Sequence, residues 1–194
     1  MGKIIRLSKP DLKGSIPLEQ AIAARRSRRD FSSRPLTLEQ ISQLLWSAQG
    51  EGQKGFRTAP SAGATYPLDV FVVTEKGLFH YLPGKHSLES IADNDLRSEL
   101  ASAALGQKFI EKAPVTVIFT ANFERTTGYY GRRGIRYVFM EAGHSAQNVH
   151  LQAEALGLGS VAVGAFDDDS VRAVLKLPGH LEPIYMVVVG YCRD

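Results

Sequence analysis

The sequence predicts a single α+β domain over residues 1–194, with helices flanking a mixed central sheet. Its composition, 44% hydrophobic and 22% charged, suits a chain with one core. Helical and strand patterns do not alternate regularly, and two strand segments form an expected antiparallel hairpin. This irregular order is typical of α+β domains.

The first expected helix runs toward a basic segment. Ser15 is its expected N-cap, and Pro17 is tolerated in the first turn. Positions i, i+3, i+4 and i+7 predict an inward-facing stripe at Leu18, Ala21, Ile22 and Arg25.

The basic residues that follow, residues 25–29, are a candidate anion site. In an extended chain Arg25, Ser27 and Arg29 share a side, and two guanidiniums with a hydroxyl suit a phosphate. Alternatively, these charges only complement the negative end of the helix. We expect no nucleic-acid partner, because only Phe31 lies near as an aromatic residue.

A second helix and a small-residue turn follow. Thr37 and Gln40 form a capping box, and the helix continues to Gly50. Residues 51–57 are polar and Gly-rich and predict a loop. Residues 60–67, PSAGATYP, let backbone amides approach a flat ligand closely, although the pattern also fits any tight turn.

The middle of the chain predicts most of the sheet. Residues 70–74 and 78–82 form the hairpin, and residues 115–120 form a buried strand. Residues 93–95 offer caps for a short helix between them. Residues 121–134 have the composition of a loop.

The longest periodic segment covers residues 135–156. It predicts a helix of about six turns with an apolar seam at Phe139, Ala142, Ala146, Val149, Ala153 and Leu156. The small residues Ala142, Gly143 and Ala146 suit close packing against a helix of a second subunit. We expect His144, Gln147 and Asn148 to be solvated or satisfied at an interface.

The C-terminal part adds two strands and a capped helix. Residues 160–163 and 184–189 predict buried strands, and residues 167–170 cap the helix between them. The glycines at 157, 159 and 164 follow a helix and precede or end a strand, so they do not form a dinucleotide-binding turn.

Several classes of function are not expected. No apolar segment approaches the 18 or so residues of a membrane span, and no secretory signal begins the chain, so we expect a cytoplasmic protein. The histidines show no metal-ligand spacing, so we expect no metal. Cys192 is the single cysteine and is interpreted as structural. The net charge of +3 suits an anionic ligand.

Four segments in order resemble the FMN-dependent nitroreductases. They are RRSRRDF (25–31), PSAGATYP (60–67), EAGHSAQN (141–148), and LGLGS (156–160) with VGAF (163–166). The forms PSAGA-x-YP, RG-x-RY and EAGH are most similar to the subgroup that contains the azoline oxidases. The resemblance runs from about residue 15 to the end, and it implies the family's fold, a homodimer and FMN.

The resemblance also implies roles for single residues. Arg25 and Ser27 would hold the ribityl phosphate, with contributions from Arg26 and Arg193, and Arg29 would lie toward the pyrimidine edge of the flavin. Pro60, Ser61, Ala62 and Gly63 would cover the flavin from the other subunit. The amides of Gly164 and Ala165 would face flavin N5, which exchanges hydride.

One position departs from the azoline-oxidase pattern. Its Lys-Tyr pair falls on Tyr129 and Tyr130, so the tyrosine matches and the lysine is absent. A phenol with a pKa of about 10 is a poor replacement for that lysine in proton transfer. We therefore expect an NAD(P)H-dependent reductase of nitroaromatics or quinones, with Gly164 and Tyr130 as catalytic candidates. The alternatives are a dehydrogenase of a peptide or other small molecule, and a flavin-binding protein without turnover.

Overall fold

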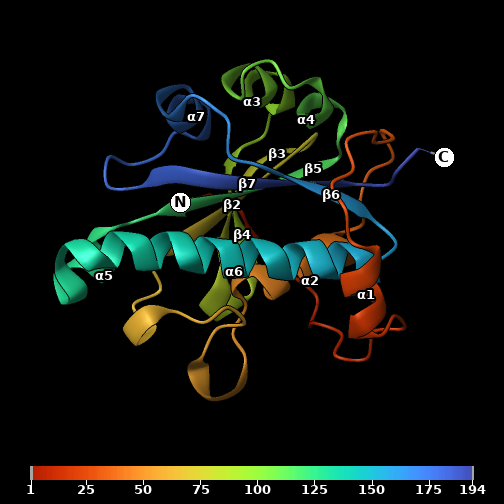
Figure 1. Ribbon diagram of the computed structural model, residues 1–194. Coiled ribbons are helices and arrows are strands. Elements are labelled where there is room, and N and C mark those ends of the chain that lie inside the picture. The colour runs from red at the N-terminus through yellow and green to blue at the C-terminus, as the bar shows by residue number, and fades with distance from the viewer. Residues whose placement is uncertain (1, 194) are drawn as a thin grey trace.

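A seven-stranded sheet lies between two layers of helices in the computed structural model, which describes residues 2–193 (Figure 1). The sheet order is β1-β4-β3-β2-β5-β7-β6. The strands are β1 Ile4–Arg6, β2 Leu68–Thr74, β3 Gly77–Leu82, β4 Ser87–Ala92, β5 Val115–Ala121, β6 Gly159–Val163 and β7 Glu182–Gly190. The expected α+β class is confirmed.

The strands of the sheet pair in a mainly antiparallel arrangement. Neighbouring named strands pair antiparallel, including the predicted β2–β3 hairpin. A parallel bridge joins Ser27 to Ser160, so the chain before α2 adds a parallel neighbour at the β6 edge. All seven residues of β5 are buried, as expected for a strand covered on both faces.

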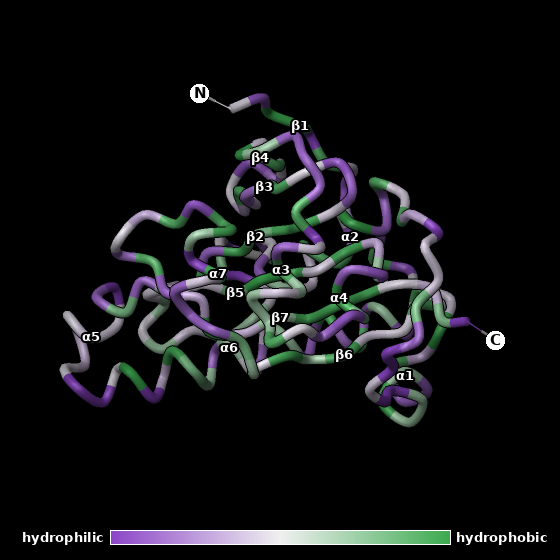
Figure 2. The backbone as a smooth tube through the Cα atoms, turned by 90° about the horizontal axis from the view of Figure 1, so that it is seen from above, coloured by the Kyte–Doolittle hydropathy of each residue, from purple (hydrophilic) through white to green (hydrophobic). Residues whose placement is uncertain are grey.

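Each face of the sheet has its own helical cover. The helices α3 (Arg97–Ala103), α4 (Lys108–Lys112) and α7 (Asp168–Leu175) cover one face, and α2 (Leu38–Gln49) and α6 (Gly134–Ala155) cover the other (Figure 1). Seen from above, the hydrophobic residues concentrate in the central strands and thin out toward the ends of the chain (Figure 2).

The two short helices α1 (Leu18–Ala24) and α5 (Glu124–Tyr130) lie at opposite ends of the long helix α6 (Figure 1). Short 3-10 helices cover Gln53–Gly55, Ala62–Ala64, Pro83–Lys85 and Gly131–Arg133. No helix within residues 2–193 is long and apolar enough to cross a membrane.

Several element predictions are confirmed at the level of single contacts. The Thr37 hydroxyl accepts from the Gln40 N–H at 3.2 Å and the Gln40 side chain accepts from the Thr37 N–H at 3.0 Å, which is the predicted capping box. Asp167 caps α7 by accepting from the Ser170 N–H at 2.8 Å. The long helix begins and ends within one residue of its predicted limits.

Other predictions were wrong for physical reasons. The first helix begins after Pro17, not at Ser15, and Leu18 and Ile22 are exposed, so the stripe buries only Ala21 within this chain. The segment 121–134, expected as a loop, contains α5, because packing against α6 outweighs the low helix propensity of Gly128. Strands β1 and β4 and helix α4 were not predicted.

The seam of α6 faces the core of its own chain. Ala142 and Ala146, expected to approach a second subunit, are buried against the sheet and α2, whereas Phe139 of the predicted seam is 53% exposed. Gly143 and His144 are exposed. The helix therefore offers the face that contains Phe139 and Gly143, not Ala146, to any partner.

Candidate functional site

The basic segment lies along the β6 edge of the sheet. Ser27 bridges Ser160, and the Arg28 N–H donates to the Ser160 carbonyl at 3.0 Å. Arg28 turns toward α6 and lies 3.7 Å from the Glu154 carboxylate. Among the described residues Arg25 has no carboxylate within 4 Å, so its charge is available to a bound anion.

Arg29 does not lie with Arg25 and Ser27, which we call the Arg25 cradle. Its guanidinium lies 5.8 Å from the ring centroid of Phe109 in α4, on the opposite face of the sheet from α6. The expectation that Arg25, Ser27 and Arg29 gather on one side is therefore not met. Arg26 is exposed, and Arg193 lies 3.9 Å from the Asp30 carboxylate beside the same segment.

The far end of β6 presents exposed backbone. Gly164 and Ala165 follow the strand directly and are exposed. The Gln107 side chain donates to the Ala165 carbonyl at 2.9 Å and so holds the next peptide, between Ala165 and Phe166. Gly164 lies four residues beyond Ser160, roughly 13 Å along an extended strand. The edge thus joins an anion cradle to an accessible pair of backbone N–H groups.

A buried neutral histidine contacts Ser160, the bridge partner of Ser27 in the cradle. The His150 ring on α6 lies 2.7 Å from the Ser160 hydroxyl and is only 7% exposed. Desolvation, with a contribution from the charge of Arg25, lowers the pKa of His150 to about 4. His150 was not predicted as a site residue, although it lies one helical turn beyond Ala146 in the predicted seam.

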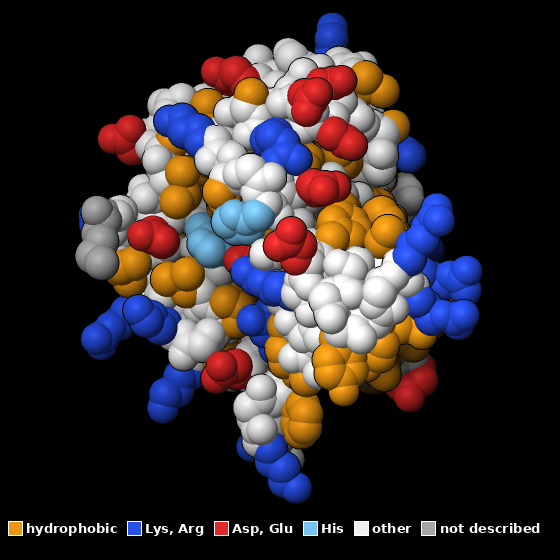
Figure 3. Space-filling view, turned by 90° about the vertical axis from the view of Figure 1, so that its left-hand side faces the viewer, with side chains coloured by type: hydrophobic (Ala, Val, Ile, Leu, Met, Phe, Trp, Pro, Cys, Tyr) orange, Lys and Arg blue, Asp and Glu red, His pale blue; other side chains and the backbone are white. Residues whose placement is uncertain are grey.

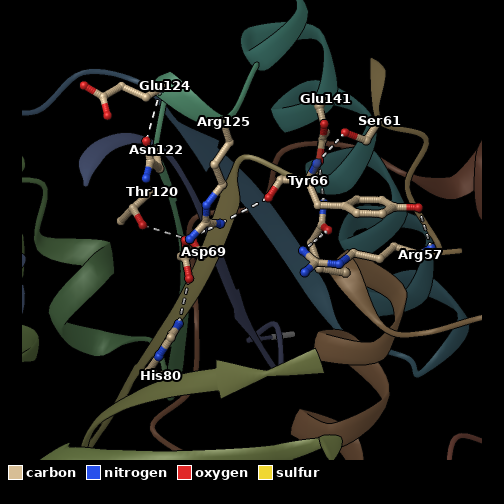
Figure 4. A network of polar contacts seen from close by, with 11 residues as sticks. Arg57, Ser61, Tyr66, Asp69, His80, Thr120, Asn122, Glu124, Arg125 and Glu141 are labelled. Carbon is tan, nitrogen blue, oxygen red and sulfur yellow. Dashed lines mark hydrogen bonds and ion pairs between the residues drawn. The ribbon is translucent and has the colours of Figure 1, made fainter. Parts of the chain in front are cut away.

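The turn at residues 60–67 forms a second polar site (Figure 4). Three of its residues have positive φ, namely Gly63 at 59°, Ala64 at 52° and Tyr66 at 45°. For the two residues with side chains this region is sparsely populated, so surrounding contacts must hold the turn. The Ser61 hydroxyl accepts from the Tyr66 N–H at 2.9 Å, and the Arg57 guanidinium lies 4.6 Å from the Tyr66 ring centroid.

Below the turn lies the carboxyl group of Glu141. It is 2% exposed and accepts from the Gln49 amide at 3.3 Å. Desolvation raises the pKa of Glu141 to about 7, against the hydrogen bonds from Ser61 and Gln49 and the charge of Arg57. Burial also lowers the pKa of Arg57.

Tyr130 closes the turn from α5. A Cβ atom at Gly63 would lie 2.8 Å from the Tyr130 hydroxyl, so this approach requires glycine. Tyr130 packs edge-on against Tyr129 and Tyr137, at centroid distances of 4.8 and 5.2 Å. The structure thus brings the catalytic candidate Tyr130 to the predicted turn.

An ion cluster that was not predicted anchors α5 to the same turn (Figure 4). Arg125 lies 2.9 Å from the Asp69 carboxylate and donates to the Tyr66 carbonyl at 3.2 Å. His80 lies 3.1 Å from the other Asp69 oxygen. Burial opposes ionisation of Asp69, but the hydrogen bond with His80 and the charge of Arg125 lower its pKa below the usual value.

The two groups of predicted site residues lie apart within one chain. Glu141 and His150 mark them on α6, nine residues or about 13 Å apart. Between the strands that carry them, β2 and β6, lie β5 and β7. Pro60, Ser61, Ala62 and Gly63 therefore do not contact the Arg25 cradle of their own chain.

The sequence model of the nitroreductase family matches residues 22–191. The chain therefore belongs to the nitroreductase family.

Individual relatives agree with this placement. A protein of Methanocaldococcus jannaschii, provisionally named a nitroreductase, is 47% identical over 197 residues and 98% of both chains. The microcin B17-processing protein McbC of Escherichia coli is 30% identical over 173 residues, which cover 82% of this chain and 64% of McbC. An FMN reductase (NADPH) of Bacillus subtilis is 25% identical and covers 89% of this chain and 64% of the reductase. This chain thus spans about two thirds of those two relatives.

The fold has close solved counterparts. A structure from Ralstonia eutropha, also provisionally described as a nitroreductase, superimposes with a TM-score of 0.89 at 33% identity. It covers 98% of this chain and 90% of that one. These findings identify a flavin oxidoreductase of the nitroreductase family.

Proposed function

We propose that this protein binds FMN and transfers hydride from NAD(P)H to a small electron acceptor such as a nitroaromatic or a quinone. The observation that carries the proposal is the β6 edge. Arg25, without a carboxylate partner among the described residues, lies two residues before Ser27, and Ser27's bridge partner Ser160 is roughly 13 Å along the strand from the exposed Gly164. The FMN reductase among the relatives supports the choice of cofactor.

The residues present fit the phosphate of this cofactor. Arg25 and Ser27 offer a guanidinium and a hydroxyl beside Ser160, and Arg26 and Arg193 add positive charge near them. Arg28 is already engaged with Glu154 and does not take part. His150, which is neutral, adds no charge to the cradle.

The peptides of Gly164 and Ala165 fit the redox-active edge of the flavin. Bound FMN supplies the acceptor and donor of hydride, so no protein nucleophile is needed. Gln107 holds the adjacent Ala165–Phe166 peptide, and backbone donors kept in a fixed segment stabilise developing negative charge without reorganising. Arg29 lies over α4, the helix that follows Gln107, and its charge favours the reduced ring.

We further propose that each flavin is shared between two copies of the chain. The turn at residues 60–63 lies far from the Arg25 cradle of its own chain, so a second copy would bring it over the flavin. Hydrophobic side chains are exposed on α6, Phe139 at 53% and Met140 at 51%, and on α1 at Leu18 and Ile22. Exposed hydrophobic side chains on these two helices favour an interface, and homodimers pair the same surface of both copies.

A second candidate function is dehydrogenation of a peptide or other small molecule. The relation to McbC and the position of Tyr130 at the turn favour it. Tyr129 is exposed and stands where the azoline-oxidase pattern has lysine, so the proton acceptor of that reaction is absent. A flavin-binding protein without turnover is the remaining alternative.

Stopped-flow reduction by NADH and by NADPH tests the proposal. We expect the purified protein to hold about one FMN per chain and one of the two nicotinamides to bleach it within seconds. Oxidation by a quinone should then restore the absorbance. A protein that binds no flavin, or a bound flavin that neither nicotinamide reduces, would contradict the proposal.

A further inference from the structure

We propose that Arg125 is a positioning residue that acts through Tyr130. By tying α5 to the central sheet and to the turn at residues 60–67, its guanidinium fixes where the Tyr130 hydroxyl stands against that turn. The inference rests on the proposed function, because Tyr130 and the turn are taken to lie over the flavin of the second copy, where the electron acceptor binds.

One nitrogen of the Arg125 guanidinium makes two contacts at once (Figure 4). It lies 2.9 Å from the Asp69 carboxylate and donates to the Tyr66 carbonyl at 3.2 Å. Asp69 belongs to β2, which pairs with β3 on one side and with β5 on the other. The guanidinium therefore joins a short surface helix to a strand that is hydrogen-bonded along both edges.

The carbonyl that Arg125 holds belongs to a strained residue. Tyr66 has a φ of 45°, which is sparsely populated for a residue with a side chain. Its N–H donates to the Ser61 hydroxyl at 2.9 Å, and its own hydroxyl accepts from the Arg57 N–H at 3.3 Å. Contacts at the N–H, the carbonyl and the side chain together hold this conformation, and Arg125 provides the one at the carbonyl.

A second contact of α5 reaches the same turn. The hydroxyl groups of Thr126 and Thr65 lie 2.8 Å apart, and Thr126 is 1% exposed. Of the seven described residues of α5, only Thr126 is buried. A helix this short is not stable by itself, so its place depends on contacts outside it.

Tyr130 lies at the other end of α5, five residues or about 7.5 Å along the helix axis from Arg125. A Cβ atom at Gly63 would lie 2.8 Å from its hydroxyl, so the two segments are in close contact there. A displacement of α5 at Arg125 is transmitted along the helix to Tyr130. Because a misplacement of about 1 Å can slow a reaction by about 100-fold, Arg125 can affect the rate without touching the substrate.

A second Arg–Asp pair provides a matched control. Arg97 lies 2.7 Å from the Asp95 carboxylate and donates to the Ala113 carbonyl at 3.3 Å, so it makes the same two kinds of contact as Arg125. It begins α3, on the face of the sheet opposite α6 (Figure 1). Removing Arg97 therefore removes a similar pair without disturbing α5.

The first test uses the protein without flavin. In Arg125→Gln the amides of α5 and of residues 61–66 should exchange hydrogen about three- to tenfold faster than in the wild type, because a charge-assisted contact is lost. Arg97→Gln should leave the exchange of these amides unchanged. Equal exchange in the wild type and in Arg125→Gln would overturn the inference.

The second test follows the oxidation of the reduced protein by a quinone in a double-mutant cycle. Arg125→Gln should slow this step by about 10- to 100-fold at unchanged FMN content. Arg125→Lys should recover part of the rate, because lysine keeps the charge but not the planar fork. In the Tyr130→Phe background, Arg125→Gln should have little further effect, because the hydroxyl that Arg125 positions is gone.

The cycle distinguishes positioning from a general structural role. Equal slowing by Arg125→Gln in both backgrounds would overturn the inference alone, and so would a Tyr130→Phe protein with the rate of the wild type. If Arg125→Gln does not fold, Arg125→Lys serves for the same comparison. A wild type that binds no flavin, or whose flavin neither nicotinamide reduces, would overturn the proposed function as well.

Discussion

The two ends of α6 each bury one titratable side chain, and burial acts on them in opposite directions. At one end the pKa of His150 falls to about 4, and at the other the pKa of Glu141 rises to about 7. In both cases desolvation is the largest cause and favours the neutral form. The difference lies in the neighbours, because Arg25 reinforces the shift of His150 whereas Arg57 opposes that of Glu141.

Because of this difference, the charge at one site is independent of pH in the physiological range, and the charge at the other is not. His150 stays neutral throughout the physiological range, so the charge of the Arg25 cradle does not depend on pH there. The pKa of Glu141 falls within that range, so the charge beneath the turn depends on pH there. Each end can be disturbed separately, which allows the comparison to be tested.

The largest expected effect lies at the cradle. Arg25→Ala should weaken FMN binding by about 2 to 5 kcal/mol, the cost of removing one partner of a desolvated charge pair. Arg28→Ala is the matched control, because Arg28 faces Glu154 and should change folding stability more than FMN affinity. Fluorescence titration measures both, and equal losses of affinity would contradict the assignment of Arg25.

A second prediction concerns folding stability as a function of pH. His150 has a folded pKa below its unfolded value of about 6.5, so its contribution is lost as the pH falls toward 4. Glu141 has a folded pKa above its unfolded value of about 4.5, so its contribution is lost as the pH rises toward 7. Each change amounts to about 3 kcal/mol, and the two nearly cancel between pH 4.5 and 6.5.

Single variants should separate these two opposing pH dependences of folding stability. Relative to the wild type, Glu141→Gln should lose about 3 kcal/mol of stability on acidification from pH 7 to 4.5, because only the His150 effect remains. His150→Gln should gain a similar amount over the same interval. Urea unfolding at several pH values measures this, and taking differences from the wild type removes the contributions of other groups. Variants whose stability runs parallel to that of the wild type would show that neither group titrates as described.

The sequence predicted the elements whose signal is local. The capping box at Thr37, the hairpin β2–β3 and the period of α6 are readable within a short window, and all are confirmed. Helix α5 was missed because its stability comes from packing against α6 and from the Arg125–Asp69 ion pair. No local pattern contains those contacts.

The same distinction between local signals and contacts made only in the fold applies to the candidate site. Arg25 and Ser27 lie in one short motif, which the resemblance could mark, whereas Glu141, Arg57 and Gln49 meet only in the fold. One signal was available in the sequence. Glu141 precedes Ala142 of the apolar seam and lies one turn before the buried Ser145, so a carboxyl group stood at a predicted core position.

A third prediction addresses the exposed surface of α6. Figure 3 shows the side of the molecule that is on the left in Figure 1, where hydrophobic side chains lie beside groups of Lys and Arg. Met140→Glu should weaken dimerisation by at least about tenfold, or about 1.4 kcal/mol, while the monomer stays folded. Ala146→Glu should instead unfold the chain, because Ala146 is buried in its own core. Sedimentation across a dilution series distinguishes them, and a Met140→Glu protein with undiminished self-association would exclude this face as the interface.

The smallest expected effect is a difference in folding stability between alanine substitutions at two glycines, one in each region. Gly63 has a φ of 59°, and an added Cβ would lie 2.8 Å from the Tyr130 hydroxyl, so Gly63→Ala should cost about 1 to 2 kcal/mol of stability. At Gly164 an added Cβ would meet its nearest neighbour, the Tyr185 ring, at an ordinary 3.7 Å, and no positive φ is required. Gly164→Ala should therefore change stability by less than about 0.5 kcal/mol. Thermal unfolding of the two variants measures the difference. Equal stability would mean that Tyr130 does not hold the turn, and the strained geometry at residues 63–66 would then depend on other contacts, such as those of Tyr66 with Ser61, Arg125 and Arg57.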